Sequence, residues 1–348
     1  MASPETVRLS TAAAIALGFR GGRLYRDAKV GCINLLMEDD DGCLGNCLYC
    51  GQAREVAQGP ECRTLIRVQW PSYSVREVVE AIRSAAERDP SIERVCVSAL
   101  TTPNACEHLV EIVKTIRDGT TLKVSALVTP TVFRAADLRE VAAAGVENIT
   151  VAIDAATAEL FEALRGSDAR GPHHWRTYIQ GVEDAVLAMQ GTKGTVGVHL
   201  IIGLGESEQE AVHFMQACYD MGARVHLFSF YPEENTGLKG RSQPPLESYR
   251  RIQLARHLID TGRSRAEAMR FESGVLVDFG MSEDEILGIV RQGTPFMTTG
   301  CSGCNRPYAN ETPAQAMQGL FRNYPFPPNT WDIQGIEAQL GMARRHQG

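Results

Sequence analysis

The sequence predicts an α/β protein built as a (β/α)8 barrel of the TIM type. Short β-rich runs alternate with amphipathic helical stretches along most of the 348 residues, and this alternation is typical of a parallel sheet covered by helices. Eight repeats over such a length favour a closed barrel, and no composition break or low-complexity linker divides the chain. An open, doubly wound sheet is the structural alternative.

Eight runs rich in β-branched and other apolar residues are expected to form the strands. These runs are Val30–Met37, Arg94–Leu100, Leu122–Val128, Asn148–Asp154, Thr195–Gly203, Arg224–Tyr231, Met269–Val275 and Pro295–Gly300. In a barrel of this type, functional side chains gather in the loops that follow the strands, at the C-terminal face. We therefore search for a site first in those loops.

The helices between the strands have recognisable ends. Three of them are expected to begin at a capping box, a serine followed three positions later by a glutamate. The pairs are Ser74 with Glu77, Ser207 with Glu210, and Ser282 with Glu285. Three glycines follow helical runs at positions where a left-handed residue is expected, namely Gly145, Gly222 and Gly293.

Two extensions flank the predicted barrel. Residues 1–28 are expected to form an N-terminal helical extension, and residues 29–311 the barrel itself. The tail 312–348 carries prolines and aromatic residues and is expected to lie as a strap across the barrel.

Composition excludes several classes of function. With 35 Lys and Arg against 42 Asp and Glu, the net charge is −7, and a mildly acidic chain offers no positive field for a nucleic acid. The N-terminus lacks the basic flank and apolar core of a signal peptide. No run approaches the length of a membrane span. We therefore expect a cytoplasmic protein with no nucleic-acid or membrane partner, whose ten cysteines are reduced thiols.

Three cysteines directly after the first predicted strand form the most informative motif. The stretch reads Asp41-Gly-Cys-Leu-Gly-Asn-Cys-Leu-Tyr-Cys-Gly-Gln52, with thiols at Cys43, Cys47 and Cys50. Three thiolates in a glycine-containing loop hold three irons of a cubane cluster and leave the fourth iron open to a chelating ligand. Zinc is the alternative, but structural zinc sites are closed by four ligands.

This Cys-x3-Cys-x2-Cys loop after a first barrel strand resembles the signature of the radical S-adenosylmethionine (SAM) superfamily. The resemblance implies a 4Fe–4S cluster on Cys43, Cys47 and Cys50, whose open iron binds the methionine group of SAM. It implies further that electron transfer breaks a carbon–sulfur bond and releases a 5′-deoxyadenosyl radical. Tyr49 matches the aromatic position that packs near the adenine in this family; a simple loop anchor is the structural alternative.

Other cofactor contacts follow the family pattern less closely. The second strand of the family ends in Gly-Gly-Glu, which orients the methionine amine, whereas this chain reads Val95-Cys-Val-Ser-Ala-Leu-Thr-Thr102. Ser98 and Thr101 are the candidates for that contact. Asp154 ends the fourth predicted strand, where related enzymes place a polar ribose contact; a helix N-cap or a charge at the barrel rim is the alternative.

The fifth strand and its turn read His199-Leu-Ile-Ile-Gly-Leu-Gly-Glu-Ser207. Glycines here allow the backbone to approach an adenine or a carboxylate closely, so Gly203 and Glu206 are candidate cofactor contacts. From about Asn148 to Glu210, together with the cluster loop, the chain resembles lipoyl and biotin synthases.

A second cysteine pair, Cys301 and Cys304, follows the eighth predicted strand in Gly300-Cys-Ser-Gly-Cys-Asn-Arg-Pro307. A Cys-x2-Cys pair alone permits zinc, redox exchange or an iron–sulfur cluster. In a closed barrel the eighth strand lies beside the first, so the pair is expected to face the same mouth as the first cluster. Cys32 and Cys62 are the candidates that would complete a second cubane.

The remaining cysteines carry weaker expectations. Cys96 lies on the second predicted strand and is a reserve ligand. Cys106 and Cys218 fall on predicted helices and are expected to be packing residues.

Taken together, the cluster loop, the Gly-Leu-Gly-Glu turn and the Cys-Ser-Gly-Cys-Asn-Arg-Pro segment resemble the two-component lipoyl synthases of the biotin-synthase-related branch. The chain lacks the C-terminal Arg-Ser-Ser-Tyr of single-chain lipoyl synthases. The resemblance implies sulfur insertion into octanoyl-lysine, with a sacrificial auxiliary 4Fe–4S cluster. The implied partners are an octanoylated lipoyl carrier domain or H-protein, a homologous radical SAM protein, and an electron donor such as ferredoxin or flavodoxin.

Two other functions stay open at this stage. One is a different radical enzyme on the same scaffold, either a biotin-synthase-like sulfur transferase or a mutase; a mutase has no need for Cys301 and Cys304. The other is a non-catalytic iron–sulfur protein, which has no need for a deep barrel or an open iron.

Overall fold

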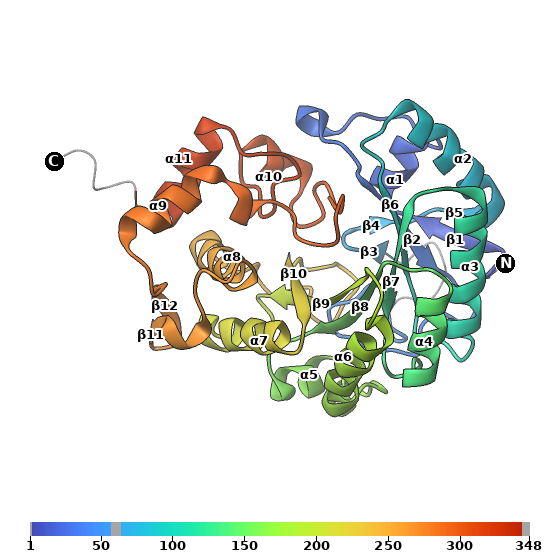
Figure 1. Cartoon of the computed structure of the whole chain (residues 1–348), viewed down its shortest axis with the longest axis horizontal. Coiled ribbons are helices and arrows are strands. Elements are labelled where there is room, and N and C mark those ends of the chain that lie inside the picture. Colours follow the sequence, from blue (N-terminus) through green and yellow to red (C-terminus); the bar gives the residue numbers. More distant parts are fainter. Residues whose placement is uncertain (1, 57–63, 343–348) are drawn as a thin grey trace.

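The expected α/β fold of the TIM type is confirmed by the computed structural model, which describes residues 2–56 and 64–342. A central sheet of eight strands has the order β10-β9-β8-β7-β6-β2-β1-β5. Every neighbouring pair from β2 to β10 is parallel, while β1 is antiparallel to both β2 and β5. Helices cover the outer face of the sheet (Figure 1).

The six parallel strands lie where the sequence predicts the first six. They are β2 (Cys32–Met37), β6 (Arg94–Ser98), β7 (Lys123–Val128), β8 (Asn148–Asp154), β9 (Thr195–Ile202) and β10 (Ala223–Ser229). The shorter strands are β1 (Thr6–Leu9), β3 (Thr64–Leu65), β4 (Val68–Gln69), β5 (Ser72–Ser74), β11 (Arg270–Glu272) and β12 (Val275–Asp278).

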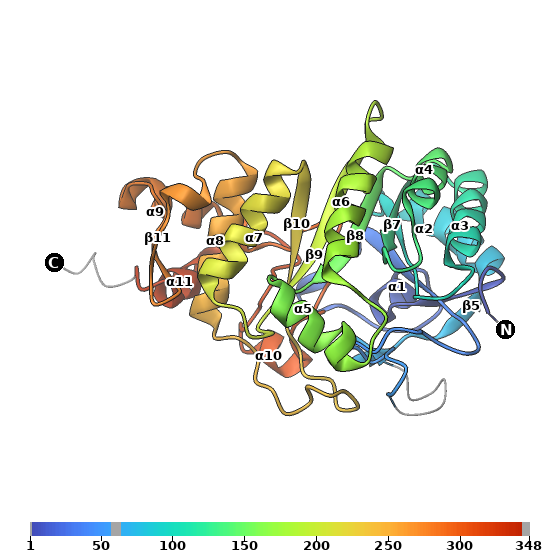
Figure 2. The same cartoon turned by 90° about the horizontal axis from the view of Figure 1, so that it is seen from below.

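The helices alternate with these strands. They are α1 (Thr11–Ala16), α2 (Val75–Arg88), α3 (Ala105–Gly119), α4 (Ala135–Ala143), α5 (Ala158–Leu164), α6 (Trp175–Met189), α7 (Glu208–Asp220), α8 (Leu246–Asp260), α9 (Glu283–Gln292), α10 (Pro313–Met317) and α11 (Thr330–Gln339). Short 3-10 turns are η1 (Tyr25–Asp27), η3 (Ser167–Ala169), η4 (Ala266–Ala268) and η5 (Thr294–Phe296). Helices α9 and α11 lie at the opposite end of the long axis from α2 and α3 (Figure 1 and Figure 2).

The predicted helix ends are confirmed. Capping boxes begin α2, α7 and α9 at Ser74, Ser207 and Ser282. The three glycines expected to be left-handed all have positive φ, with values of 98°, 92° and 74° in chain order, and they end the preceding helices without a Cβ penalty. No helix within the described residues is long and apolar enough to cross a membrane.

The last two predicted strands are wrong. Instead of a barrel strand, Met269–Val275 contains part of the separate two-stranded β11–β12 hairpin, because Ser273 and Gly274 both have positive φ and turn the chain. The run Pro295–Gly300 begins in η5, with a proline at its start, and pairs only through an isolated bridge between Met297 and Tyr324.

The N-terminal extension differs from the helical segment that the sequence suggests. It contains β1 before α1, and β1 pairs with β2 in the register Val7 to Met37. The side chains of β1 are all buried. The extension therefore widens the sheet next to β2.

The segment Met297–Asn305 spans the space between β10 and the start of β2. Thr299 Oγ1 accepts a hydrogen bond of 2.8 Å from the Leu227 backbone in β10. Farther along, the Asn305 side-chain amide donates to the carbonyl of Lys29, just before β2. The segment thus carries Cys301 and Cys304 into the region where an eighth strand was expected.

Side chains alternate along each strand, so neighbouring residues either pack in the hydrophobic core or face the central cavity. In β8, Ile149, Val151 and Ile153 are fully buried in the hydrophobic core. Thr150 and Asp154, on the alternate positions, line a central cavity instead. The same period of two therefore decides which side chains the strands offer to a ligand.

Close packing on the outer face gives a test of this arrangement. A Cβ added at Gly181 on α6 would lie 2.4 Å from Cγ of Pro130, in the loop after β7. Because the proline ring is rigid, we expect Gly181→Ala to lower the free energy of unfolding by about 1–3 kcal/mol, measured by urea denaturation.

The matched control is Gly288→Ala on α9, where an added Cβ meets nothing within 4 Å. This variant is expected to raise the free energy of unfolding by about 0.5–1 kcal/mol, since alanine favours the helix. A Gly181→Ala protein as stable as wild type would contradict the close contact between α6 and the loop.

Candidate active site

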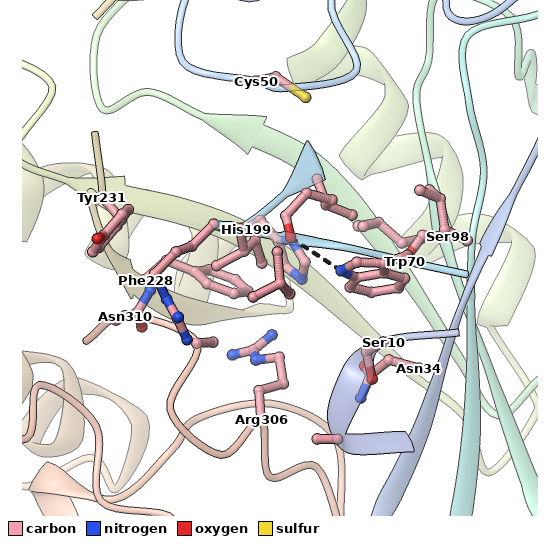
Figure 3. A pocket seen from close by; sticks show the side chains of 18 of the residues that line it. Ser10, Asn34, Cys50, Trp70, Ser98, His199, Phe228, Tyr231, Arg306 and Asn310 are labelled. Atoms are coloured by element: carbon pink, nitrogen blue, oxygen red, sulfur yellow. Dashed lines mark hydrogen bonds between the residues drawn. The ribbon is translucent and has the colours of Figure 1, made fainter. Parts of the chain in front are cut away.

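A central cavity of about 610 Å³ lies within the parallel sheet. Its lining comes from the inward positions of β2, β6, β8, β9 and β10, from the loop after β2, and from the segment that follows η5. In Figure 3, Cys50 lies on one side of the cavity and Arg306 on the opposite side, with His199 and Phe228 between them. The predicted site residues Tyr49, Ser98, Thr101 and Asp154 all line this cavity.

The loop after β2 is anchored to three other parts of the chain. Leu44 N donates to the Thr101 carbonyl at 2.9 Å, and Leu48 N donates to the Leu164 carbonyl at 2.8 Å. The Asn46 amide donates to the Ala169 carbonyl at 2.7 Å. Glycine at position 45 lets the loop pass close to His173, because a Cβ there would lie 2.9 Å from His173 Nε2. These contacts fix the loop against the loop after β6, α5 and η3.

All three thiols of this loop line the cavity. Backbone N–H groups donate to two of the sulfurs, from Gly45 to Cys43 at 3.3 Å and from Gln52 to Cys50 at 3.4 Å. Burial raises the pKa of Cys47 to about 11 and also raises the pKa of Cys50, so a bound cation is needed to keep these sulfurs as thiolates. The donor set fits a cluster with three cysteine ligands.

Within residues 2–56 and 64–342, no three His, Cys, Asp or Glu side chains surround a single point as the ligands of one metal ion do. A cubane binds each thiolate through a different iron, so its cysteines stand farther apart than the ligands of one zinc ion.

Asp154 at the end of β8 belongs to a buried network of hydrogen bonds. Its Oδ2 accepts from Tyr49 Oη and from Arg165 Nη1, both at 2.8 Å. Burial raises the pKa of Asp154, while Arg165 and Tyr49 oppose that rise. Asp154 has a left-handed φ of 68°, and the pairing of β8 with β9 shifts register just before it. The alternative of a helix N-cap is wrong, because Thr157 caps α5.

Arg165 holds this network together and was not identified from the sequence. Only 2% of the residue is exposed. Besides Asp154, its guanidinium donates to the carbonyl of Ile153 at 2.9 Å and to Tyr178 Oη at 3.1 Å. Tyr178 in turn hydrogen-bonds to His173, the residue packed against the cluster loop. The network therefore connects the end of β8 to the cysteine loop.

The two candidate contacts for the methionine amine have different surroundings. Ser98 ends β6 and faces the cavity. Thr101 is buried, and its hydroxyl shares a hydrogen bond of 3.3 Å with Thr129. Since Thr101 also accepts from the cluster loop through its carbonyl, its clearest contribution is to position that loop.

Gly203 and Glu206 lie outside the lining of the cavity. The Glu206 carboxylate accepts from Gly203 N at 2.6 Å and from Leu204 N at 3.0 Å, which closes the turn after β9. Gly203 has a φ of 107°, and a Cβ there would lie 2.6 Å from the ring of Pro244. In this structure both residues shape the turn.

The second cysteine pair reaches the same cavity at its other end. Cys301 and Cys304 line the cavity, but they lie near the first residues of the strands. Ser125, in the first half of β7, donates to Cys301 Sγ at 3.3 Å, and Cys32 is the first residue of β2. The expectation that this pair faces the same mouth as the cluster loop is therefore wrong, because the segment Met297–Asn305 approaches β2 at its beginning.

The other cysteines separate into two groups. Cys96 lines the cavity together with the second pair. Cys106 on α3 is partly buried and lies near the carbonyl of Asp137, and Cys218 on α7 is fully buried in the core. Cys62 lies outside the described residues.

Hydrogen bonding couples the thiols of the second group. The contact with Cys32 lowers the pKa of Cys304 to about 6, and Arg306 and Arg94 act in the same direction. The same contact, a second one with Cys96, and burial raise the pKa of Cys32. Burial also raises the pKa of Cys301 to about 12.

Comparison with known proteins decides the family. Residues 38–218, more than half of the chain, match the model of the radical SAM superfamily. The chain belongs to the radical SAM superfamily. Members of this superfamily use a 4Fe–4S cluster and SAM, and the loop of Cys43, Cys47 and Cys50 lies within the matched range. No curated protein sequence matches the chain.

Solved structures share the radical SAM fold at low sequence identity. HydG, a maturase of the [FeFe]-hydrogenase, is 17% identical with a TM-score of 0.50 over 63% of this chain and 47% of its own. HydG from Carboxydothermus hydrogenoformans is 16% identical with a TM-score of 0.50 over 72% and 55%. Methylornithine synthase (PylB) is 14% identical with a TM-score of 0.48 over 71% and 66%. The chain spans about half the length of the two maturases.

The buried ion pair of Arg165 and Asp154 gives a test of the site. Arg165→Gln leaves the Asp154 carboxylate buried without its cation, so we expect the free energy of unfolding to fall by about 3–5 kcal/mol in urea denaturation. Adding Asp154→Asn to this variant is expected to restore part of the loss, since the unpaired charge is then removed.

Arg170→Gln is the matched control. Arg170 lies five positions away, its side chain is 74% exposed, and it pairs with Glu55 at the surface. Its loss is expected to cost about 0–1 kcal/mol. Equal costs for the two variants would contradict the role given to Arg165.

Proposed function

We propose that this radical SAM protein inserts sulfur into an unactivated carbon chain, as one component of a lipoyl synthase acting on octanoyl-lysine of a carrier domain. One observation carries the proposal. Two separate groups of cysteines line a single cavity, with Cys43, Cys47 and Cys50 at the ends of the strands and Cys301 and Cys304 near their beginnings. A substrate held between them has a radical source on one side and a sulfur source on the other.

When bound, the first cluster and SAM supply a carbon-centred radical, and a second cluster supplies sulfide. The residues of this chain perform the other tasks. Tyr49 and Arg165 hold the Asp154 carboxylate at the rim of the cavity, where it is placed to accept from ribose hydroxyls. The enclosing strands exclude water, which protects a reactive radical from side reactions.

The middle of the cavity favours a hydrocarbon chain. Apolar side chains from four strands and from the β3–β4 hairpin form its wall, and the set comprises Leu36, Leu65, Val68, Ala152, Ile201 and Phe228. A saturated acyl chain binds such a wall through the burial of apolar surface.

The outer part of the lining supports a substrate that is delivered by another protein. Tyr25 and Met317 line the cavity and are 44% and 68% exposed, and Leu320 beyond α10 is 38% exposed. Exposed apolar side chains at a cavity entrance suit a docking partner. We propose a lipoyl carrier domain or H-protein in this role, a homologous radical SAM protein as the second component, and ferredoxin or flavodoxin as electron donor.

A specific observation favours a second candidate, a biotin-synthase-like sulfur transferase with a polar substrate. The Arg306 guanidinium lies 3.7 Å from the centre of the Phe228 ring and donates to the Thr299 carbonyl. Within the described residues, no carboxylate lies within ion-pair distance of it. His199 and His226 line the same wall, and burial lowers the pKa of each, so both imidazoles are neutral hydrogen-bonding groups. A carboxylate or ureido group fits beside them.

Anaerobic turnover of an octanoylated lysyl peptide tests the proposal, with and without a homologous partner. Wild type is expected to release 5′-deoxyadenosine and to add the mass of sulfur to the peptide. Cys47→Ala is expected to abolish both products, whereas Cys301→Ala is expected to cleave SAM without forming thiolated peptide.

The controls separate the candidates. Thiolated product from Cys301→Ala would overturn sulfur insertion at the second cysteine group. Active SAM cleavage by wild type with no mass gain on the peptide would favour the second candidate, and a substrate with a carboxylate would then be the next probe.

A further inference from the structure

The pairing of two strands shows where Cys96 lies relative to Cys32. Adjacent parallel strands β2 and β6 pair Cys32 with Arg94 and Asn34 with Cys96. Because side chains alternate along a strand, Cys32 and Asn34 share one face of β2, and Arg94 and Cys96 share the corresponding face of β6. Cys96 and Asn34 line the cavity. Cys32 and Cys96 are therefore diagonal neighbours on the inner face.

The Cys301–Cys304 turn is fixed against these strand beginnings. Arg94 donates through Nε to the Ser302 carbonyl at 2.9 Å, through Nη2 to Ser302 Oγ at 3.0 Å, and through Nη1 to Ser125 Oγ at 2.8 Å. Gly31 approaches the turn so closely that a Cβ there would lie 2.3 Å from the Gly303 carbonyl oxygen. The turn therefore has one position relative to β2, β6 and β7.

The two cysteine loops share a backbone feature. Cys304 N donates to the Cys301 carbonyl at 2.9 Å, and in the first loop Cys50 N donates to the Cys47 carbonyl at 3.0 Å. In each case a Cys-x2-Cys turn brings two thiols to the same side of the chain. The second turn thus has the backbone form of a loop whose thiols fit a cluster.

We infer that Cys32, Cys96, Cys301 and Cys304 form the complete ligand set of a second iron–sulfur cluster at the strand-start end of the cavity, with Cys96 as the fourth ligand and Cys62 outside it. The inference deepens the proposed function, on which it rests for the presence of a second cluster. Four thiolates close a cubane, so this cluster has no open iron. A cluster held by these residues would supply sulfide to the cavity, because Cys96, Cys301 and Cys304 line it.

Charge in the surroundings suits such a cluster. Arg94 is only 4% exposed, and its Nη2 lies 3.8 Å from the carboxylate of Glu147. Arg306 lines the same cavity as Cys301 and Cys304. Two guanidinium groups thus oppose the negative charge that four thiolates bring to a cluster.

Thr64, the first described residue after Cys62 in the sequence, contacts the first cysteine loop. The Thr64 carbonyl accepts from Gln52 at 2.6 Å, and Gln52 N donates to Cys50 of the first loop. The four cysteines at the strand beginnings complete a set without Cys62.

A background lacking the first cluster isolates the second one. The triple variant C43A/C47A/C50A is reconstituted anaerobically with iron and sulfide and measured by iron and sulfide content and by Mössbauer spectroscopy. We expect about four irons per chain with the spectrum of a cubane. In this background, Cys96→Ala is expected to lose most of that iron, and Cys96→Ser is expected to change the spectrum if some iron is retained.

Cys62→Ala and Cys106→Ala in the same background are the matched controls, and both are expected to keep the full iron content. Loss of iron in Cys62→Ala with retention in Cys96→Ala would overturn the ligand set. A triple variant that binds zinc in place of iron, or no metal, would overturn the cluster itself. Far-UV circular dichroism of each variant shows whether iron was lost through unfolding.

The iron content of these variants is measured without turnover, so it tests the ligand set separately from the proposed reaction. A chain that holds iron on these four cysteines but forms no thiolated peptide contradicts the proposed sulfur insertion and leaves the ligand set standing. A Cys96→Ala protein that keeps the second cluster and still forms thiolated peptide contradicts the ligand set and leaves the proposed reaction standing.

Discussion

Alternation of side chains along six parallel strands is the constraint on which the site depends. It sends alternate residues of β2, β6, β8 and β9 toward one cavity, for example Thr150 and Ala152 of β8, and packs the residues between them in the core under the helices. Cys32 begins β2 and the loop of Cys43–Cys50 follows its end, so the strand separates the two cysteine groups. At about 3.3 Å per residue, the six residues of β2 make a strand on the order of 20 Å long, so the two groups lie toward opposite ends of it.

The buried network around Arg165 couples this frame to the first cysteine loop. Arg165 satisfies strand carbonyls, the Asp154 carboxylate and Tyr178 at once, and Tyr49 of the loop binds the same carboxylate. A buried ion pair costs desolvation that its hydrogen bonds have to offset, and here each of those bonds also positions a wall of the cavity. The same few side chains therefore stabilise the fold and position the residues that face the cavity.

The sequence was informative where local patterns decide the structure. Runs rich in β-branched and apolar residues located the six parallel strands, and the Cys-x3-Cys-x2-Cys spacing located the first cysteine group. Prediction from the sequence failed where segments that are distant in the chain come into contact. The Ser273–Gly274 turn converts a predicted seventh strand into a hairpin, and only the pairing of β2 with β6 shows that Cys96 stands beside Cys32. Arg165 was missed because its partners, which are strand carbonyls, Asp154 and Tyr178, come together only in the folded chain.

Two cysteine groups at opposite ends of one cavity are the central claim, and both are expected to hold iron. Crystals of the anaerobically reconstituted protein, measured at the iron absorption edge, test it most directly. We expect two iron-rich peaks in the anomalous difference map, one beside Cys43, Cys47 and Cys50 and one among Cys32, Cys96, Cys301 and Cys304. A single peak at the first loop, with none near Cys301 and Cys304, would contradict the claim.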